Sequence, residues 1–333
     1  MTISSREIHL VRRPVGALTA DDFCIREASL DENVPGQVIV RNSHMSVDPY
    51  MRRRMDDLPS YIPPFRLNKA MSGSAVGEVV ASTYPDISVG DWVSHERGWR
   101  DYAAVPGVQT TKINTTAAEA SAYLGLLGLP GITAYVGVTH IAKLEEGDTI
   151  FVSGAAGAVG SIAGQIAKIK GARVIGSAGT EEKTTWLREE LGFDAVINYR
   201  TSDLTEALRQ AAPEGIDVYF DNVGYDHLDA ALAAANNGAR FAICGTIADY
   251  DTQSPPAGPR NLFQIVAKRL SIRGFIVADH YDLMGEFTTS MLGWYRDGAL
   301  HYRETHRHGL DSAVEAMSEM LHGANVGKMI VAL

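Results

Sequence analysis

The hydrophobic pattern of the chain changes character near residue 116. Before that point, apolar residues come in short Val/Ile-rich or alternating runs bounded by Gly, Pro and Asp, which predicts β-strands. The expected strands span residues 23–28, 37–45, 73–80 and 91–94. A loop at 52–66 contains three prolines. It is long enough to border a site, although a plain surface linker would have the same composition.

After residue 116 the apolar positions take helical spacing, at 117–127 and 133–142, with an interruption at 128–131. From residue 149 strands and helices alternate. The expected strands are 149–153, 173–177, 195–198, 217–220, 240–244 and 271–277, and the expected helices are 158–170, 181–191, 202–211, 225–235 and 279–296. Repeated βα units of this length predict a parallel sheet with right-handed crossovers. A final helix at 310–321 and strand at 328–332 are expected to return to the N-terminal β domain.

The turn after the first of these strands consists almost wholly of glycine and alanine. Ala155, Gly157 and Gly160 occupy the three small positions of a dinucleotide-binding turn, with alanine in the first. Small residues let the backbone approach a pyrophosphate, and the following helix offers free N–H groups and the positive end of its dipole. A structural turn would also favour small residues, so the pattern indicates a nucleotide site without proving one.

The next strand ends without the carboxylate that usually holds the ribose 2′-OH of NAD. Lys183 lies one turn into the following helix, and Tyr199 and Arg200 follow the third strand. A cation and several hydrogen-bond donors near the adenosine end favour NADP over NAD. Glu181 and Glu182 argue the other way, but acidic residues at a helix start are also explained by the helix dipole.

Composition narrows the class of protein. The chain has 333 residues, 45% of them hydrophobic and 21% charged, and a formal net charge of −10. This describes a globular protein with a substantial core and argues against general affinity for nucleic acid or an anionic membrane. The two cysteines, Cys24 and Cys244, lie far apart, which is typical of a reducing compartment. No apolar run reaches membrane-spanning length, so we expect a cytoplasmic protein.

The densest polar cluster runs from His301 to His308 and contains three histidines. Their spacing lacks the i, i+4 histidine pair with an intervening glutamate that helical zinc sites use. We therefore interpret the cluster as a solvated polar face.

Several segments together resemble one known family. They are Ser46-Val-Asp-Pro-Tyr-Met-Arg52, Gly128-Leu-Pro-Gly-Ile-Thr-Ala-Tyr135, Gly154-Ala-Ala-Gly-Ala-Val-Gly-Ser161, Phe220-Asp-Asn-Val-Gly224, Arg273-Gly-Phe-Ile-Val277 and Asn325-Val-Gly-Lys328. With them the chain resembles the zinc-independent medium-chain dehydrogenases/reductases. Within that superfamily it is similar to the branch of leukotriene 12-hydroxydehydrogenase/prostaglandin reductase, plant double-bond reductases and bacterial curcumin reductase.

The resemblance implies an α/β protein with two domains. A GroES-like β domain would comprise residues 1–120 and 300–333, and a Rossmann domain with a doubly wound parallel sheet would comprise 121–299. It also implies a homodimer, usually through the nucleotide-binding domains.

Carried over position by position, the resemblance implies a set of site residues. Tyr50 and Tyr250 would line the substrate pocket and act as catalytic donors. The NADP-binding residues would be Ala156, Gly157, Ala158, Val159, Gly179, Lys183, Tyr199, Asn222, Cys244, Tyr250, Phe275, Val277 and Asn325. The sequence departs from the family pattern at Tyr225, where relatives usually carry glycine, and at Ala248-Asp249. Both departures lie near the expected substrate pocket.

Zinc-dependent members of the superfamily need three firm protein ligands around a catalytic metal. This chain offers His44 and Asp48 without a cysteine, and then Glu78 alone, so we expect no metal site. Without a Lewis acid, reduction of the C=C bond of an α,β-unsaturated ketone or aldehyde by NADPH fits better than alcohol oxidation. A quinone reductase and a catalytically silent NADPH-binding protein remain alternatives.

Two features bear on the substrate. The run Arg52-Arg53-Arg54 either recognises an acidic substrate or belongs to a solvated loop. The loop 52–66 and residues 246–260 are expected to shape the mouth of the pocket, and Tyr61, Phe65 and Phe263 suggest an apolar or aromatic substrate.

Overall fold

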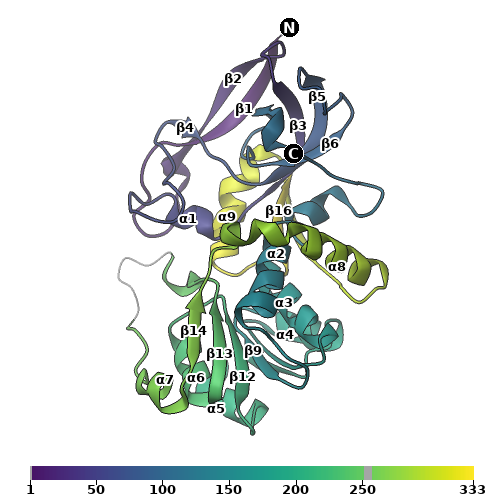
Figure 1. The fold of residues 1–333 in the computed structure, drawn as a ribbon. Helices are drawn as coiled ribbons and strands as arrows, with labels where there is room; N and C mark the ends of the chain where they lie inside the picture. Colours follow the sequence, from purple (N-terminus) through teal and green to yellow (C-terminus); the bar gives the residue numbers. More distant parts are fainter. Residues whose placement is uncertain (1, 251–256) are drawn as a thin grey trace.

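The computed structural model describes residues 2–250 and 257–333, and it consists of two lobes stacked on one another (Figure 1). The β lobe carries a three-stranded sheet, in the order β2-β1-β4, and a seven-stranded sheet, β15-β16-β3-β5-β6-β8, with β7 paired to β3. The strands are β1 (Thr2–Leu10), β2 (Phe23–Asp31), β3 (Gln37–Ser46), β4 (Lys69–Ala70), β5 (Ala75–Ser82), β6 (Trp92–His95), β7 (Tyr102–Pro106), β8 (Thr111–Lys112), β15 (Glu304–His308) and β16 (Lys328–Ala332). Both ends of the chain therefore contribute to this lobe.

The parallel lobe is built on a six-stranded sheet in the order β11-β10-β9-β12-β13-β14, in which all neighbouring pairs are parallel. Its strands are β9 (Thr149–Val152), β10 (Arg173–Ala178), β11 (Ala195–Asn198), β12 (Ile216–Asp221), β13 (Ala235–Ile243) and β14 (Ser271–Gly274). Its helices are α3 (Ala158–Ile169), α4 (Glu181–Glu189), α5 (Leu204–Ala211), α6 (Asp226–Ala234) and α7 (Phe263–Lys268). This strand order reverses direction beside β9, as in dinucleotide-binding sheets, and confirms the expected fold class.

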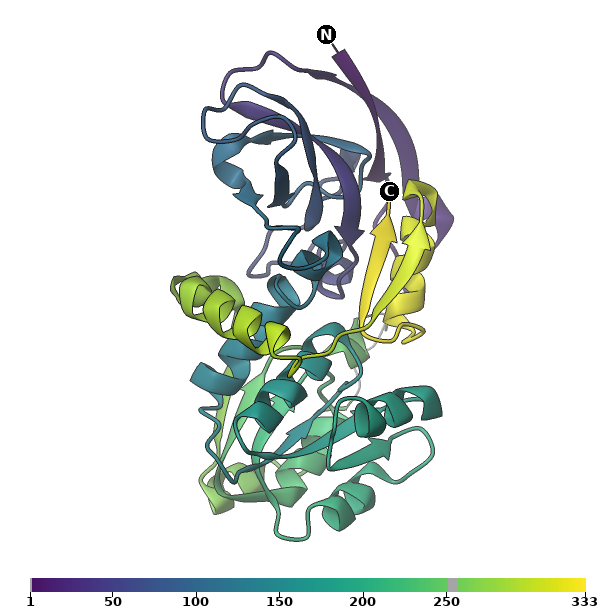
Figure 2. The ribbon, with the colours of Figure 1, turned by 90° about the vertical axis from the view of Figure 1, so that its right-hand side faces the viewer.

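Two helical segments lie at the junction between the lobes (Figure 1). One is α2 (Leu129–Val136), continued by a π-helical turn over Gly137–Ile141, and the other is the 3₁₀ turn Val277–Leu283 followed by α8 (Met284–Arg296). Viewed from the side, the C-terminal strands β15 and β16 and helix α9 (Ala313–Leu321) stand in the upper lobe beside the N-terminal strands (Figure 2). None of the helices in the described residues is long and apolar enough to cross a bilayer.

The structure departs from the elements expected from the sequence pattern in three segments. The expected interruption at 128–131 ends earlier than predicted, because Gly128 is the N-cap of α2 and α2 begins at Leu129 with a proline in its first turn, where a missing N–H is no loss. The expected helix at 117–127 is only a 3₁₀ segment over Ala120–Leu124. The polar cluster 301–308, interpreted as a solvated polar face, contains strand β15, which pairs parallel with β16, and all its residues are exposed or half-buried.

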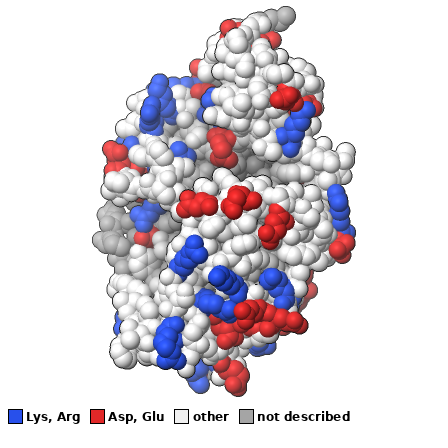
Figure 3. Space-filling model, in the orientation of Figure 1, with Lys and Arg blue, Asp and Glu red and all other residues white. Residues whose placement is uncertain are grey.

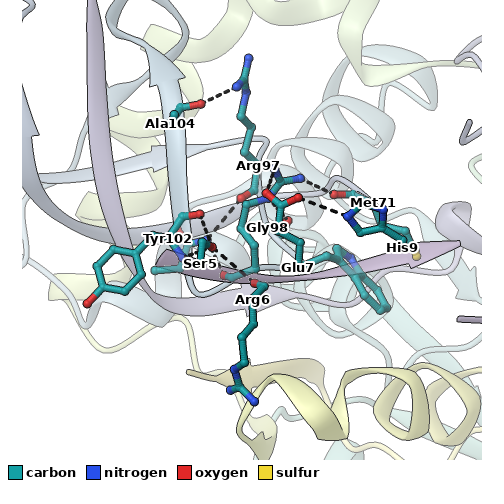
Figure 4. Close-up of polar contacts among 12 residues, drawn as sticks. Ser5, Arg6, Glu7, His9, Met71, Arg97, Gly98, Tyr102 and Ala104 are labelled. Carbon is teal, nitrogen blue, oxygen red and sulfur yellow. Dashed lines mark hydrogen bonds and ion pairs between the residues drawn. The ribbon is translucent and has the colours of Figure 1, made fainter. Parts of the chain in front are cut away.

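The first strand, β1, was missed because it alternates polar and apolar residues without a Val/Ile-rich run. A buried polar network holds it in place (Figure 4). Ser5 Oγ donates to the backbone oxygen of Tyr102 (2.8 Å) and accepts from its N–H. Glu7, which is 9% exposed, accepts a hydrogen bond from Arg100 Nη1 at 3.0 Å. These contacts join residues almost a hundred positions apart, so the pattern of neighbouring residues along the chain does not predict them.

The surface carries both signs of charge. On the face drawn in Figure 3, basic and acidic side chains occur on both lobes, and the net charge of the chain is −10.

Candidate functional site

The glycine-rich turn follows β9 directly and leads into α3. Gly157 is the N-cap of α3, and no side chain caps it, so the first amide groups of the helix are left for a ligand. A Cβ atom at Gly160 would lie 2.5 Å from the backbone oxygen of Gly154 and 2.8 Å from Ala155 Cα. The third small position is therefore required by the packing of the turn against its own helix.

A cavity of about 1320 Å³ opens beside this turn between the two lobes. It exceeds the roughly 300–1,000 Å³ of ordinary ligand pockets, which suits a dinucleotide together with a substrate. The predicted catalytic and NADP-binding residues all contribute to its wall: Tyr50, Ala156, Gly157, Ala158, Val159, Gly179, Lys183, Tyr199, Asn222, Cys244, Tyr250, Phe275, Val277 and Asn325. The structure thus brings together residues that are spread over 275 positions, from 50 to 325.

At one part of the cavity two cations lie close to each other. Lys183 Nζ donates to the backbone oxygen of Gly323 at 2.7 Å. Burial, and next the charge of Arg200, lower the pKa of Lys183. A Cβ atom at Gly179 would lie 2.9 Å from the Tyr199 hydroxyl and 3.1 Å from Arg200 Nε. A bound phosphate would offset the repulsion between the two cations, so this cluster fits the 2′-phosphate of NADP.

A second part of the cavity is organised by the turn after β12. Asp221 is fully buried and accepts hydrogen bonds from the N–H groups of Val223 (2.9 Å) and Gly224 (2.8 Å). Its neighbour Asn222 donates through Nδ2 to the backbone oxygen of Ser153 at 2.7 Å. The turn therefore fixes the Asn222 amide at the carboxyl edge of the sheet, where ligands bind in such folds.

The C-terminal segment closes over the glycine turn. The N–H of Gly327 donates to the backbone oxygen of Ala156 at 2.8 Å, and Asn325 Nδ2 donates to the backbone oxygen of Gly327 at 2.7 Å. Asn325 is 9% exposed. A residue from the last tenth of the chain is thereby held against the turn that is expected to carry the pyrophosphate.

Tyr50 and Tyr250 reach the cavity from different lobes. Tyr50 begins the short helix α1 (Tyr50–Arg53), which Met51 anchors in the core of the β lobe. Burial, and next the Asp48 carboxylate, raise the pKa of Tyr50 well above its usual value. Burial, and next Tyr61, raise the pKa of Tyr250 to about 12. Both hydroxyls therefore keep their protons at neutral pH and can donate hydrogen bonds.

The aromatic residues expected around the substrate behave differently from one another. Tyr61 lines the cavity, together with Ile62. Phe65 instead lies in the core, 5% exposed, beneath the guanidinium of Arg54. Phe263 is 75% exposed on α7. Neither phenylalanine lines the cavity, so that expectation was wrong for both. Of the expected border 246–260, residues 251–256 lie outside the described part of the chain.

The arginine run is not a solvated loop. Arg52 is 4% exposed and donates to Asp56 Oδ1 at 2.8 Å. Arg53 donates to Asp249 Oδ2 at 2.6 Å, and Arg54 covers the ring of Phe65. Each arginine thus has a defined partner within the protein.

The side chains considered as metal ligands are engaged elsewhere. His44 lies 2.9 Å from Ser43 Oγ, Asp48 pairs with Lys328 at 3.2 Å, and Glu78 pairs with Arg41 at 2.6 Å. The described residues contain no group of three or more His, Cys, Asp or Glu side chains placed to hold a metal ion.

Sequence reasoning missed the pair Lys328–Asp48 as part of the cavity wall. The two side chains are 4% and 9% exposed, and both residues line the cavity. Lys328 Nζ also donates to the backbone oxygens of Val47 and Met329, each at 2.8 Å. The signal available in the sequence was a lysine heading an apolar strand, where a buried charge needs a partner.

Comparisons with known proteins agree with this geometry. Residues 6–113 match the family described as the N-terminal domain of oxidoreductase, and residues 158–293 match the family described as zinc-binding dehydrogenase. The chain is 40% identical to the NADPH-dependent curcumin reductase of Escherichia coli K12, over 97% of this chain and 95% of that protein. It is 37% identical to the NADP(+)-dependent 2-alkenal reductase of Nicotiana tabacum, over 99% and 97%. The crystal structure of CurA from Vibrio vulnificus in complex with NADPH superposes with a TM-score of 0.93, at 41% identity and 98% coverage of both chains.

Proposed function

We propose that this chain, which belongs to the zinc-independent branch of the medium-chain dehydrogenases/reductases, reduces the C=C bond of α,β-unsaturated ketones and aldehydes with NADPH. The observation that carries the proposal is a single cavity that holds both a cation cluster suited to a 2′-phosphate and two protonated tyrosines from opposite lobes. The related curcumin and 2-alkenal reductases act on substrates of this class according to their names.

The cofactor would be held along its length by residues of both lobes. The free amide groups at the start of α3, at Ala158 and Val159, would bind the pyrophosphate next to the Ala156–Gly157 backbone. Lys183 and Tyr199, beside Gly179, would bind the 2′-phosphate. The nicotinamide half would lie against Asn222, Cys244, Phe275, Val277 and Asn325. When bound, NADPH supplies the hydride.

The tyrosines would act on the substrate carbonyl. As hydride reaches the β-carbon, negative charge develops on the carbonyl oxygen. A hydroxyl of Tyr50 or Tyr250 that donates a hydrogen bond at that position stabilises the charge. The raised pKa of Tyr250, about 12, keeps the proton in place for this role and makes the residue a poor resting base.

The test is to incubate the purified protein with NADPH and a panel of enones, enals and quinones, and to follow the loss of NADPH absorbance at ~340 nm. The proposal expects the highest kcat/KM for an enone or enal, with a product reduced at the C=C bond by mass spectrometry. Faster turnover of quinones would favour the quinone reductase instead. Tight NADPH binding without turnover of any acceptor would favour a catalytically silent binding protein.

The expected homodimer finds support in the surface of the parallel lobe. Strand β14 lies at the edge of the six-stranded sheet. The preceding helix α7 and its N-cap expose three apolar side chains, Leu262, Phe263 and Val266, by 53%, 75% and 71%. Edge strands with apolar surface beside them favour pairing with a second copy.

For the dimer we expect Phe263→Glu combined with Val266→Glu to halve the mass measured by light scattering after size exclusion, with unchanged circular dichroism. A wild-type protein that is monomeric at ~50 μM would contradict the dimer.

We propose that the chain divides into two domains and is located in the cytoplasm. The β domain would comprise 1–120 and 300–333, and the NADP-binding domain 121–299, in keeping with the sheet to which each strand belongs. Cys24 and Cys244 are free thiols, which fits a reducing compartment such as the cytoplasm.

A further inference from the structure

A cluster of side chains connects the two lobes behind the wall of the cavity. Arg53, at the end of α1 in the β lobe, donates from Nη2 to Asp249 Oδ2 at 2.6 Å. Asp249 ends a 3₁₀ turn (Ile247–Asp249) that follows β13 in the parallel lobe. The two residues are 196 positions apart in the chain. Neither lines the cavity, whereas Ile247, Ala248 and Tyr250 do.

The Asp249 carboxylate is held from several sides. Oδ2 also accepts the Tyr225 hydroxyl at 2.8 Å, and Oδ1 accepts Thr246 Oγ1 at 3.1 Å. The Asp249 side chain is only 10% exposed. Such charge-assisted hydrogen bonds are stronger than neutral ones, so the carboxylate fixes the turn that precedes Tyr250.

Arg53 also contacts Tyr250 directly. Its guanidinium carbon lies 5.2 Å from the centre of the Tyr250 ring, within the range of a cation–π contact. One side chain of the β lobe therefore holds both the carboxylate of residue 249 and the ring of residue 250.

Tyr225 adopts a backbone conformation that a side chain rarely takes. Its φ is +47° and its ψ is −114°. Strained residues of this kind persist only where the surrounding structure holds them, and they gather at functional sites. Here the Tyr225 hydroxyl is held by Asp249, and Tyr225 itself lines the cavity.

We propose that Arg53, Asp249 and Tyr225 form an interlobe clamp that positions Tyr250 for binding and reduction of the substrate. The three are positioning residues, since they act through Tyr250 and the turn before it. The clamp rests on the proposed reductase function for its catalytic effect, whereas its structural effect on residues 246–250 is independent of that function. It also assigns Arg53 a role other than contact with an acidic substrate.

Loss of the clamp affects the substrate more than the cofactor. Lys183 and Tyr199, which would bind the 2′-phosphate, make none of the clamp contacts. A partly exposed ion pair contributes little to stability by itself, whereas a small misplacement of a donor beside a reacting group lowers the rate strongly.

The experiment compares Asp249→Asn, Arg53→Gln, Tyr225→Phe and the double variant Arg53→Gln/Asp249→Asn with wild type. We expect each single substitution to lower kcat/KM for an enone by roughly 5- to 20-fold, with the NADPH Kd within about twofold of wild type. The double variant should lose less than the product of the two single losses, because both substitutions remove the Arg53–Asp249 contact that they share. Arg53→Lys keeps a cation beside Asp249 and should retain most of the wild-type activity.

Arg41→Gln is the matched control. It breaks an ion pair of the same length, Arg41–Glu78 at 2.6 Å, within the β lobe and should leave the kinetics unchanged. Hydrogen exchange of a peptide covering 246–250 supplies a readout without turnover, and its amides should exchange faster in the clamp variants and not in the control.

The outcomes separate the clamp from the proposed function. Unchanged exchange at 246–250, additive effects in the double variant, or an equal weakening of NADPH binding would overturn the clamp. A wild-type protein that reduces no enone would refute the proposed function, while faster exchange in the clamp variants would still establish the clamp. If Asp249→Asn fails to fold, Arg53→Gln and Tyr225→Phe decide the question.

Discussion

At the scale of single residues, we propose that the preference for NADP depends on two cations held close together. Lys183 and Arg200 lie near enough for the charge of Arg200 to lower the pKa of Lys183. Lys183 is fixed by the backbone oxygen of Gly323, which belongs to the C-terminal segment. A residue predicted from its place after the second strand is thus oriented by a contact that the sequence does not reveal.

We expect Lys183→Ala to weaken NADPH binding by roughly 10- to 100-fold, because a hydrogen bond to a charged group contributes about 1.5–3 kcal/mol. NADH lacks the 2′-phosphate, so its Kd should change by less than about threefold. Fluorescence titration of both cofactors measures the two constants. The control is Lys168→Ala on α3, which breaks the ion pair of Lys168 with Asp194. Equal losses for NADPH and NADH would refute the role of Lys183.

The Tyr250 hydroxyl gives a second prediction at this scale. Tyr250→Phe removes the hydrogen-bond donor while preserving the ring under Arg53. We expect kcat for an enone to fall by roughly 10- to 100-fold and the NADPH Kd to stay unchanged. Steady-state kinetics and a binding titration check both values. Tyr123→Phe loses a hydrogen bond to the backbone oxygen of Asn114 and should keep full activity. Wild-type turnover in Tyr250→Phe would remove Tyr250 from the proposed mechanism.

At the scale of elements, the turn between β9 and α3 needs small residues at two positions, Gly157 and Gly160, for two different reasons. A Cβ atom at Gly160 collides with the turn itself, at 2.5 Å from an oxygen of Gly154. A Cβ atom at Gly157 meets that oxygen at an ordinary 3.4 Å. The folded protein tolerates a side chain at residue 157, whereas a pyrophosphate close to the backbone would not.

These two glycines form a matched pair of variants. Gly160→Ala should lower the free energy of unfolding by about 1–3 kcal/mol, because overpacking strains the turn. Gly157→Ala should unfold like wild type and bind NADPH at least tenfold more weakly. Urea unfolding and NADPH titration of both variants measure the difference. Normal NADPH affinity in Gly157→Ala would mean that the pyrophosphate does not approach this backbone.

At the scale of the whole molecule, each lobe contains a buried histidine that stays neutral. Burial lowers the pKa of His95 in the β lobe to about 3 and that of His227 in the parallel lobe to about 4. His95 Nδ1 accepts the N–H of Arg97, and Nε2 lies 3.0 Å from Asn42 Oδ1. The neutral ring therefore satisfies both contacts, with its proton on Nε2.

These pKa values predict loss of stability in acid. Below pH ~6.5 the unfolded chain binds a proton at each histidine that the folded protein does not bind, so the stability falls as the pH falls from about 6.5 towards the folded pKa values. At pH 5 each of the two histidines should lower the free energy of unfolding by about 2 kcal/mol relative to pH 7.5. Urea unfolding at the two pH values measures the change, and His227→Gln should reduce it by about half. A pH-independent free energy in this range would contradict the prediction.

The sequence by itself determined the features that depend on neighbours along the chain. The alternation of strands and helices from residue 149 predicted the parallel lobe, and the glycine turn with Lys183 and Tyr199 predicted a dinucleotide site that favours NADP. These patterns are local, because helix periodicity, strand alternation and turn chemistry involve residues only a few positions apart.

The tertiary structure alone decided the features that depend on contacts between distant residues. Strands β1 and β15 have too little apolar character to be recognised from the sequence. β1 is held by its pairing with β2 and by the contact between Glu7 and Arg100, and β15 is held by its pairing with β16. The pair Lys328–Asp48 and the Arg53–Asp249 contact join positions 280 and 196 residues apart. From the sequence alone a charged side chain is expected to be exposed to solvent, because burying an unpaired charge costs free energy. The tertiary structure offsets this cost when it places an opposite charge beside the buried one.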